Sequence, residues 1–416
     1  MHYSIIAQVL SGMGISLPQR KFLQQLFPTW LSVRGRFNFM NVGRYAPVDE
    51  RTLRRWFARG FSWPEFNSLL LARLIPAGDE LIAALDASFV PKSGKKTFGL
   101  GNFFNGCLGR AQKGLEVSLV SVVDITKNTA YALSAKQTPS GDGSRETAGK
   151  SGGKKSQDKK KEIEKETRID AYLEHFRTVR SFLPKKVRYL AVDGYFTNYK
   201  FVQGVCALKL DVVGKLRRDA DLRYLYHGPQ KGRGRPRKYA GKVHWSNLDM
   251  RRWKKEGELE KGVQLYSASL YHVSLKRKIR VVMLQETKDG KTRYALLFST
   301  DLQLNARDIL RYYKGRFQIE FLFRDAKQAT GLNDCQARNK KALQFHWNAA
   351  LCAINLAKWQ EAKRSDKHTF SVASCKMRHS NERLLEVFSH KLGLDWTWIK
   401  SHPEYPALCN YGAIRP

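Results

Sequence analysis

Residues 305–330, NARDILRYYKGRFQIEFLFRDAKQAT, contain the pattern that the rest of the chain has to explain. Asn305 is a typical N-cap before a periodic run and Gly331 is a typical end, so the pattern predicts one long helix. Four polar side chains at offsets of 0, 3, 7 and 14 residues would then share a face roughly 60° wide. They are Tyr313, Arg316, Glu320 and Lys327, with Arg324 beside them.

The remaining positions of this predicted helix are mostly apolar, and we expect these side chains to be buried: Phe317, Ile319, Phe321, Leu322 and Phe323. Burying Arg, Glu and Lys without partners is costly. Two arrangements would supply partners. One is an internal ladder of salt bridges, and the other is a site for metal ions and phosphate groups. The pattern of this segment alone leaves both open.

The charge of the chain favours a polyanionic partner. Its 416 residues include 74 Lys and Arg against 37 Asp and Glu, which gives a net charge of +37. Such an excess repels itself in a compact fold, and nucleic acid is its simplest explanation. Ribosomal proteins share this charge but are usually shorter, and no basic amphipathic anchor indicates a membrane surface. The length and the 42% hydrophobic content predict two or three folded domains.

The expected compartment is intracellular. No apolar run approaches the roughly 20 residues that span a bilayer, and the N-terminus lacks the charged start of a signal peptide. The six cysteines are scattered without a Cys-x2-Cys pair, which predicts reduced thiols with neither a zinc site nor a disulfide framework.

Residues 1–75 form a basic N-terminal segment. Within it, residues 48–61 predict a helix that begins after Asp49 and presents Arg54 and Arg55 next to Trp56. Arginines on the outer face of a helix can dock in a DNA groove. The alternative is an ordinary basic surface helix that packs through Trp56.

From residue 80 onward the sequence predicts strands. Asp86 interrupts the apolar strand at residues 80–90, and Asp193 ends the apolar strand that begins at residue 187. A carboxylate in a buried strand costs several kcal/mol unless it is paired or bound to metal. Both aspartates are therefore site candidates. Residues 139–167, rich in Gly, Ser and Lys, predict a flexible loop.

Residues 217–300 break the alternation of strands and helices and predict a β-rich insertion. The segment Arg233-Gly234-Arg235-Pro236-Arg237 resembles an AT-hook, which lies in narrow minor grooves. The alternative for these three arginines is general phosphate contact by a flexible basic loop.

The order of elements predicts an α/β fold with a ribonuclease-H-like core, in which three hairpin-linked strands, a crossover helix and a parallel strand bring distant acids together. Asp86, Asp193 and Glu320 would converge there and would repel one another unless cations lay between them. Hard oxygen ligands suit Mg²⁺. Two such ions can activate water and stabilise the leaving oxygen in phosphodiester cleavage.

The same residues resemble a known family, the DDE transposases of the bacterial insertion-sequence-four group. That family's signature Tyr-x2-Arg-x3-Glu-x6-Lys is complete here as Tyr313, Arg316, Glu320 and Lys327. The sequences around Asp86 (LDASFVPK) and around the second aspartate (AVDGYF) are also similar to it. This chain departs from the best-studied members in the Gly-Tyr-Phe that follows Asp193, and Trp245 and Trp253 are only candidates for the group's base-flipping tryptophan.

The resemblance implies a Mg²⁺-dependent transposase with two ions in each active site, which Mn²⁺ could replace. Asp86, Asp193 and Glu320 would be the catalytic metal ligands, and the other signature residues, with Arg324, would contact phosphates of the DNA. The enzyme would cut double-stranded DNA at terminal inverted repeats and join it to a target as a homodimer, in the bacterial cytoplasm near the nucleoid. Two other functions use the same features: a metal-dependent nuclease without strand transfer, and a catalytically silent, domesticated DNA-binding protein.

These interpretations divide the chain into five parts. We expect a helical DNA-binding segment at residues 1–75, the ribonuclease-H-like core at 76–216 and 301–360, the β-rich insertion at 217–300 and a helical C-terminal region at 361–416.

Overall fold

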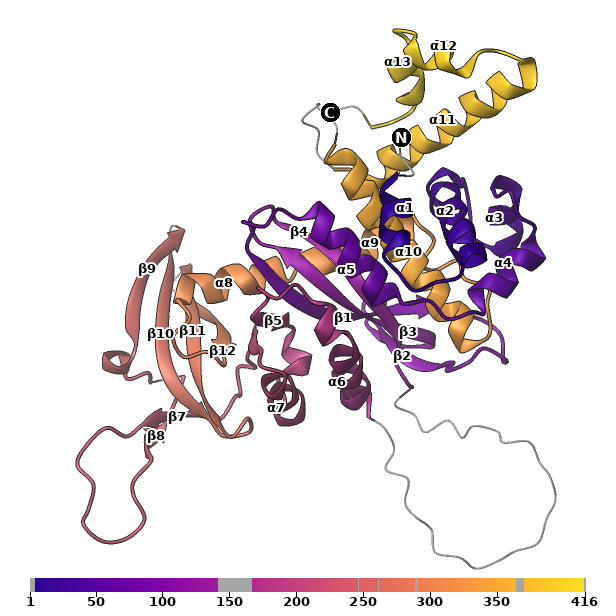
Figure 1. The fold of residues 1–416 in the computed structure, drawn as a ribbon. Helices are drawn as coiled ribbons and strands as arrows, with labels where there is room; N and C mark the ends of the chain where they lie inside the picture. Colours follow the sequence, from indigo (N-terminus) through magenta and orange to yellow (C-terminus); the bar gives the residue numbers. More distant parts are fainter. Residues whose placement is uncertain are drawn as a thin grey trace, which may run out of the picture.

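The computed structural model describes residues 4–140, 167–245, 247–260, 262–288, 291–363 and 370–414. Most of the predicted loop at residues 139–167 lies outside these residues. In the described part of the chain, one mixed sheet of 12 strands runs through the molecule, with helices packed against it (Figure 1). The predicted mixture of helices and strands is therefore confirmed, as α/β with a large mixed sheet.

The N-terminal segment is helical, as the sequence predicts. Its helices are α1 (Ser4–Ser11), α2 (Leu17–Ser32), α3 (Phe39–Tyr45), α4 (Glu50–Phe57) and α5 (Trp63–Leu74). Asp49 caps α4 by accepting the amide N–H of Thr52 at 2.7 Å. These helices share one hydrophobic cluster with the helices of the core, and the indole N–H of Trp30 donates to the carbonyl of Thr330 at 3.1 Å. The segment therefore packs onto the core through buried contacts.

The first half of the sheet contains the strands expected around Asp86 and before Asp193, together with a short strand at residues 101–105 that the sequence did not predict. It contains β1 (Leu81–Pro91), β2 (Gly101–Asn105), β3 (Arg110–Asp124), β4 (Thr129–Gln137), β5 (Tyr189–Val192) and β6 (Asp211–Lys215). The long strand β3 pairs antiparallel with β1 and carries β2 and β4 along its other edge. The strand β5 runs parallel to β1 and to β6. Because side chains alternate along β1, one face packs on α6 (Arg168–Val179) and α7 (Tyr199–Ala207).

The predicted β-rich insertion continues the same sheet. Its strands are β7 (Leu222–Leu225), β8 (Tyr239–Lys242), β9 (Lys254–Glu260), β10 (Val263–His272), β11 (Arg277–Lys288) and β12 (Lys291–Ser299). The strand β12 pairs antiparallel with β6, so hydrogen bonds join the insertion to the core. Trp253 is buried and Trp245 stacks on Tyr294 with ring centroids 5.3 Å apart. Both tryptophans therefore pack within the insertion.

The prediction of one long helix over residues 305–330 is wrong. The structure has two helices, α8 (Ala306–Gly315) and α9 (Gln318–Gln328). The chain turns more tightly between them, because the amides of Phe317, Ile319 and Glu320 bond to carbonyls three residues back, each at 3.0 Å. The predicted ends are confirmed: Asn305 caps α8, and Gly331 follows α9 with a φ of 76°.

The long helix α10 (Lys340–Glu361) lies against the exposed edge of β4. Two asparagines one heptad apart on α10 pair with the backbone of that edge strand. Asn348 bonds to both polar backbone groups of Ala135, each at 2.8 Å, and Asn355 bonds to the N–H and the carbonyl of Ala132 at 2.9 and 2.7 Å. The amides thereby satisfy an edge that would otherwise be unpaired.

The C-terminal region is helical, with α11 (Val372–Leu392), α12 (Trp396–Ser401) and α13 (Tyr405–Cys409). His346 on α10 is buried, and its Nε2 lies 2.7 Å from the carbonyl of Gly331, so it is a packed histidine. None of the six cysteines, all of which lie in the described ranges, is joined in a disulfide bond. Among the described residues, no helix is long and apolar enough to cross a membrane.

Candidate active site

The sheet places Asp86 and Asp193 side by side. Leu85 on β1 is paired with Val192 on β5 in parallel register, so the two aspartates are the next residues along each chain. Neighbouring strands are about 4.8 Å apart, and residues in parallel register point to the same face. The carboxyl end of β5 is also where open α/β sheets place their sites. Strand register therefore brings together two acids that are far apart in the sequence.

Glu320 comes to this place from the first turn of α9. The bend at Arg316 and Phe317 begins a new helix just before it, and the N-terminus of a helix favours a negative charge. Its side chain is 40% exposed, so the glutamate lies at the open edge of the cluster.

Arg316 lies between two of the three acids. Its Nη1 donates to Oδ2 of Asp86 at 3.1 Å, and its Nη2 donates to Oε1 of Glu320 at 3.0 Å. The side chain is only 7% exposed, and its Nε is buried with no hydrogen-bond partner among the described residues. One of the two alternatives, a ladder of salt bridges within residues 305–330, is thus present only in the pair of Arg316 with Glu320, and the other bridge of Arg316 reaches strand β1.

The electrostatics of Asp86 reflect its surroundings. Burial raises the pKa of this carboxyl to about 6, while Arg316 and the amide of Ala87 lower it and the carboxylates of Glu320 and Asp193 raise it further. The carboxylates of Glu320 and Asp193 thus both repel that of Asp86, and the guanidinium of Arg316 opposes this repulsion.

The other signature residues lie around this cluster. The guanidinium of Arg316 lies 5.6 Å from the ring centroid of Tyr313, whose pKa is raised chiefly by burial. Lys327 follows Glu320 by two helical turns, about 10 Å along α9. Burial lowers the pKa of Lys327, and it forms no ion pair with a described residue. Arg324 is exposed and pairs with Asp325 at 3.0 Å.

Two aromatic residues of this segment contradict the expected burial. Phe317 is 50% exposed and Phe321 is 37% exposed, with their ring centroids 5.9 Å apart. The helical pattern could not reveal this, because the bend rotates α9 relative to α8. The other apolar positions, Ile319, Leu322 and Phe323, are buried as predicted.

The remaining predicted DNA contacts lie elsewhere. Arg233, Arg235 and Arg237 are exposed in the loop between β7 and β8 (Figure 1). Arg54 pairs with Glu50 and lies 4.6 Å from the ring centroid of Phe39, whereas Arg55 bonds to Thr52 at 3.0 Å. Arg54 and Arg55 are both exposed. The structure therefore does not bring either set into the acid cluster.

The three acids offer the type of ligand, carboxylate oxygen, that a hard cation prefers. Asp86, Asp193 and Glu320 offer carboxylate oxygens at an edge that is partly open to solvent. As the side chains stand, no three His, Cys, Asp or Glu residues in the described ranges are arranged to hold a metal ion. The guanidinium of Arg316 occupies the space between Asp86 and Glu320. Metal binding at this place therefore requires that arginine to release at least one acid.

Sequence comparison identifies the family. Residues 17–266 match the family model described as DDE superfamily endonuclease, which spans more than half of the chain, and the chain belongs to this family. The matched range includes Asp86 and Asp193 and ends before Glu320. No curated protein sequence matches the chain significantly.

Among solved structures, the chain is similar to a piggyBac transposase, seen by cryo-EM in a synaptic complex with hairpin DNA. The sequence identity is 12% and the TM-score is 0.41, over 100% of this chain and 75% of that chain. A similarity at this level assigns no function.

Proposed function

We propose that the chain is a DNA transposase of the insertion-sequence-four type. It cuts double-stranded DNA at terminal inverted repeats and joins the freed ends to a target, acting as a homodimer. The observation that carries this proposal is the convergence of Asp86, Asp193 and Glu320 around Arg316. Membership of the DDE superfamily endonucleases supports DNA cleavage, and the net charge of +37 supports a nucleic-acid partner.

The strand order supports a ribonuclease-H-like core. Strands β3, β1, β5 and β6 follow one another with the first pair antiparallel and the next two parallel, and β4 extends the edge. We assign this core to residues 76–216 and 301–360. The insertion at 217–300, the N-terminal segment at 1–75 and the C-terminal region at 361–416 would then hold the DNA and the partner subunit.

Asp86, Asp193 and Glu320 are the residues that would hold Mg²⁺, or Mn²⁺ in its place. Two such ions would activate a water molecule or a DNA hydroxyl and stabilise the leaving 3′ oxygen. The chain needs no serine or histidine nucleophile for this reaction.

The chain's own cations would orient the DNA. Arg316 already has both terminal nitrogens on carboxylates, and releasing one of them frees an N–H group for a phosphate oxygen. Tyr313 lies against the same guanidinium and would restrict where it turns. Lys327 and Arg324 lie further along α9 and would contact phosphates near the scissile bond.

Cleavage of a DNA that carries the inverted repeats tests this assignment. We expect Asp86→Asn, Asp193→Asn and Glu320→Gln each to abolish Mg²⁺-dependent cutting while leaving DNA binding intact. The matched controls are Asp219→Asn and Glu174→Gln, which remove exposed acids that pair with Arg217 and Arg177 away from the cluster. Full activity in Glu320→Gln would exclude the assignment of the three acids.

A nuclease without strand transfer is the second candidate, because the family description names an endonuclease. The same three acids would serve both reactions. Analysis of the products separates them: joined molecules support transposition, whereas linear cuts alone support the nuclease.

A further inference from the structure

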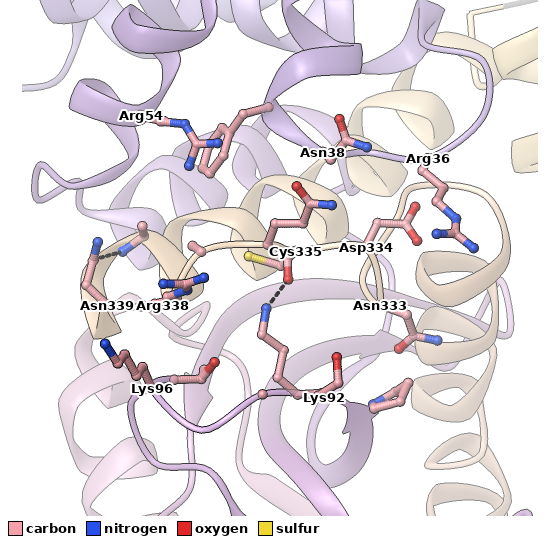
Figure 2. Close-up of a pocket in the computed structure, with 18 of the residues that line it drawn as sticks. Arg36, Asn38, Arg54, Lys92, Lys96, Asn333, Asp334, Cys335, Arg338 and Asn339 are labelled. Carbon is pink, nitrogen blue, oxygen red and sulfur yellow. Dashed lines mark hydrogen bonds between the residues drawn. The ribbon is translucent and has the colours of Figure 1, made fainter.

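A large cavity lies between the N-terminal helices and the core, apart from the acid cluster. Its volume is about 1250 Å³. Three segments line it: the region of α3 and α4, the loop at residues 91–97 after β1, and residues 333–339 between α9 and α10. Figure 2 shows side chains from these three segments facing a common space. The cavity therefore exists only because the N-terminal segment packs onto the core.

The lining of this cavity is strongly basic. It contains one acid, Asp334, and six cationic side chains: Arg36, Arg54, Lys92, Lys95, Lys96 and Arg338. Asp334 accepts the amide N–H of Phe37 at 2.9 Å. Four of the cations, Arg36, Lys95, Lys96 and Arg338, are exposed and form no ion pair with any residue that the structure describes. Like charges gathered without counterions repel, so the cavity suits a polyanion.

Lys92 fixes the shape of this cavity. Its ammonium group donates to the carbonyl of Cys335, which ties the loop after β1 to the segment before α10 (Figure 2). Its half-buried position lowers the pKa of its side chain, with Arg338 adding a smaller effect in the same direction. Lys95 and Lys96 lie beyond this anchor and are free to meet a ligand.

The lining offers charge without a surface for stacking bases. Among the described residues that line the cavity, Phe39 is the one aromatic residue. Its ring is buried, and the guanidinium of Arg54 lies 4.6 Å from the ring centroid. Proteins that hold single strands or free nucleotides stack bases on exposed aromatic rings. Contacts to phosphates, by contrast, need only cations and are typical of duplex binding.

The cavity lies along the strand that carries Asp86. The loop begins at Pro91, five residues further along β1, which is a distance of roughly 17 Å at about 3.3 Å per residue. A DNA strand advances about 3.4 Å along the helix axis per nucleotide. A duplex lying parallel to β1 would therefore span about five nucleotides between Asp86 and the start of the loop.

We propose that this basic cavity grips the phosphate backbone of double-stranded DNA about five nucleotides from the bond that the acid cluster cuts. The inference rests on the proposed function for the position of the cut, but the binding of duplex DNA by the cavity is independent of it. Lys95, Lys96 and Arg338 make the phosphate contacts, and Lys92 positions the loop that carries two of them.

The test is the salt dependence of duplex binding. We compare the chain carrying Glu320→Gln, which prevents cutting, with the same chain carrying Lys95→Gln, Lys96→Gln and Arg338→Gln. Fluorescence anisotropy of a labelled duplex gives the affinity at several salt concentrations. Each lost phosphate contact should reduce the slope of log affinity against log salt concentration by about 0.9. The slope of the triple variant should therefore be smaller than that of its parent by about 2.7.

The matched control is Lys185→Gln, Arg188→Gln and Lys209→Gln, which removes three exposed cations at the opposite end of strands β5 and β6. We expect it to keep the parent slope. The six substituted cations are all exposed, and equal thermal melting of the three proteins verifies folding. An unchanged slope in the cavity variant, or an equal loss in the control, would overturn the proposal.

Two further measurements separate the proposal from its alternatives. Phosphate ethylation interference on an end-bearing duplex should show a contact about five nucleotides from the cut that disappears only in the cavity variant. If no cutting occurs in the unsubstituted protein, the proposed function fails while the slope still tests the cavity. Tighter binding of inorganic tripolyphosphate than of a duplex would assign the cavity to a small polyanion and would refute DNA binding there.

Discussion

Replacement of Arg316 by methionine tests the electrostatic description of the acid cluster. Methionine keeps most of the packing volume but removes the charge that offsets Asp86. The contact to Glu320 should contribute little to stability, because that carboxylate is 40% exposed and screened by solvent. The contact to Asp86 should contribute more, because the Asp86 side chain is only 23% exposed and its partner Arg316 is 7% exposed.

The pKa of Asp86 determines how much stability the Arg316→Met variant should lose. With Arg316 present, burial raises this pKa from 3.8 to about 6, so the stability of the folded chain falls as the pH rises between these values. Without Arg316 the pKa rises further and the carboxyl becomes neutral. One pKa unit corresponds to about 1.4 kcal/mol. Arg316→Met should therefore lose, through Asp86, at most about 1.4 kcal/mol of unfolding free energy at pH 7 and about 2.7 kcal/mol at pH 8.

Urea unfolding of a double-mutant cycle measures this quantity. The four proteins are the parent, Arg316→Met, Asp86→Asn and the double variant, each in a chelator at pH 6, 7 and 8. The coupling free energy between the two positions should be below about 0.5 kcal/mol at pH 6 and should increase with pH towards those limits. A coupling that is independent of pH, or one that stays near zero at pH 8, would refute this description of the site.

Three other substitutions probe the fold through the free energy of unfolding. Burial lowers the pKa of His175 from 6.5 to about 3. The free energy of unfolding should therefore fall by about 1.4 kcal/mol for each pH unit below 6.5, because only the unfolded chain takes up the proton. His175→Gln should lack this pH dependence in urea titrations between pH 4.5 and 7. Gly331→Ala should lower the stability measured in thermal melts by about 2 kcal/mol more than Gly393→Ala does. Both glycines have a positive φ, but only at Gly331 would an added Cβ meet Phe37, at 2.4 Å. Equal losses of stability would contradict this contact. Asn355→Leu should cost about 2–4 kcal/mol in urea unfolding, since it leaves the backbone of β4 unpaired, and a loss below about 1 kcal/mol would show that water replaces the amide.

The sequence by itself determined the order and type of most elements. Continuous apolar runs identified the strands around Asp86 and before Asp193, and capping residues such as Asp49 and Asn305 located helix starts. These signals are local, because a strand or cap depends on residues within a few positions. The two aspartates stood out for the same local reason, since a carboxylate does not belong in an apolar run.

The tertiary structure decided what these residues contact. The bend at Arg316 and Phe317 leaves Phe317 and Phe321 exposed, and helical spacing alone predicted them buried. The sequence also gave no sign that Arg316 would reach Asp86, 230 positions away, as well as Glu320 on its own segment.

The basic cavity shows the same limit. The loop Lys-Ser-Gly-Lys-Lys at residues 92–96 is visible in the sequence as a short basic run, and it lies only six residues beyond Asp86. Its meaning depends on Arg36 and Arg54 from the N-terminal segment and on Arg338 from the segment before α10. Local patterns determine elements, whereas the packing of distant elements determines which charges share one space. Sequence therefore identified the acids of the candidate site, and only the folded chain placed an arginine between them.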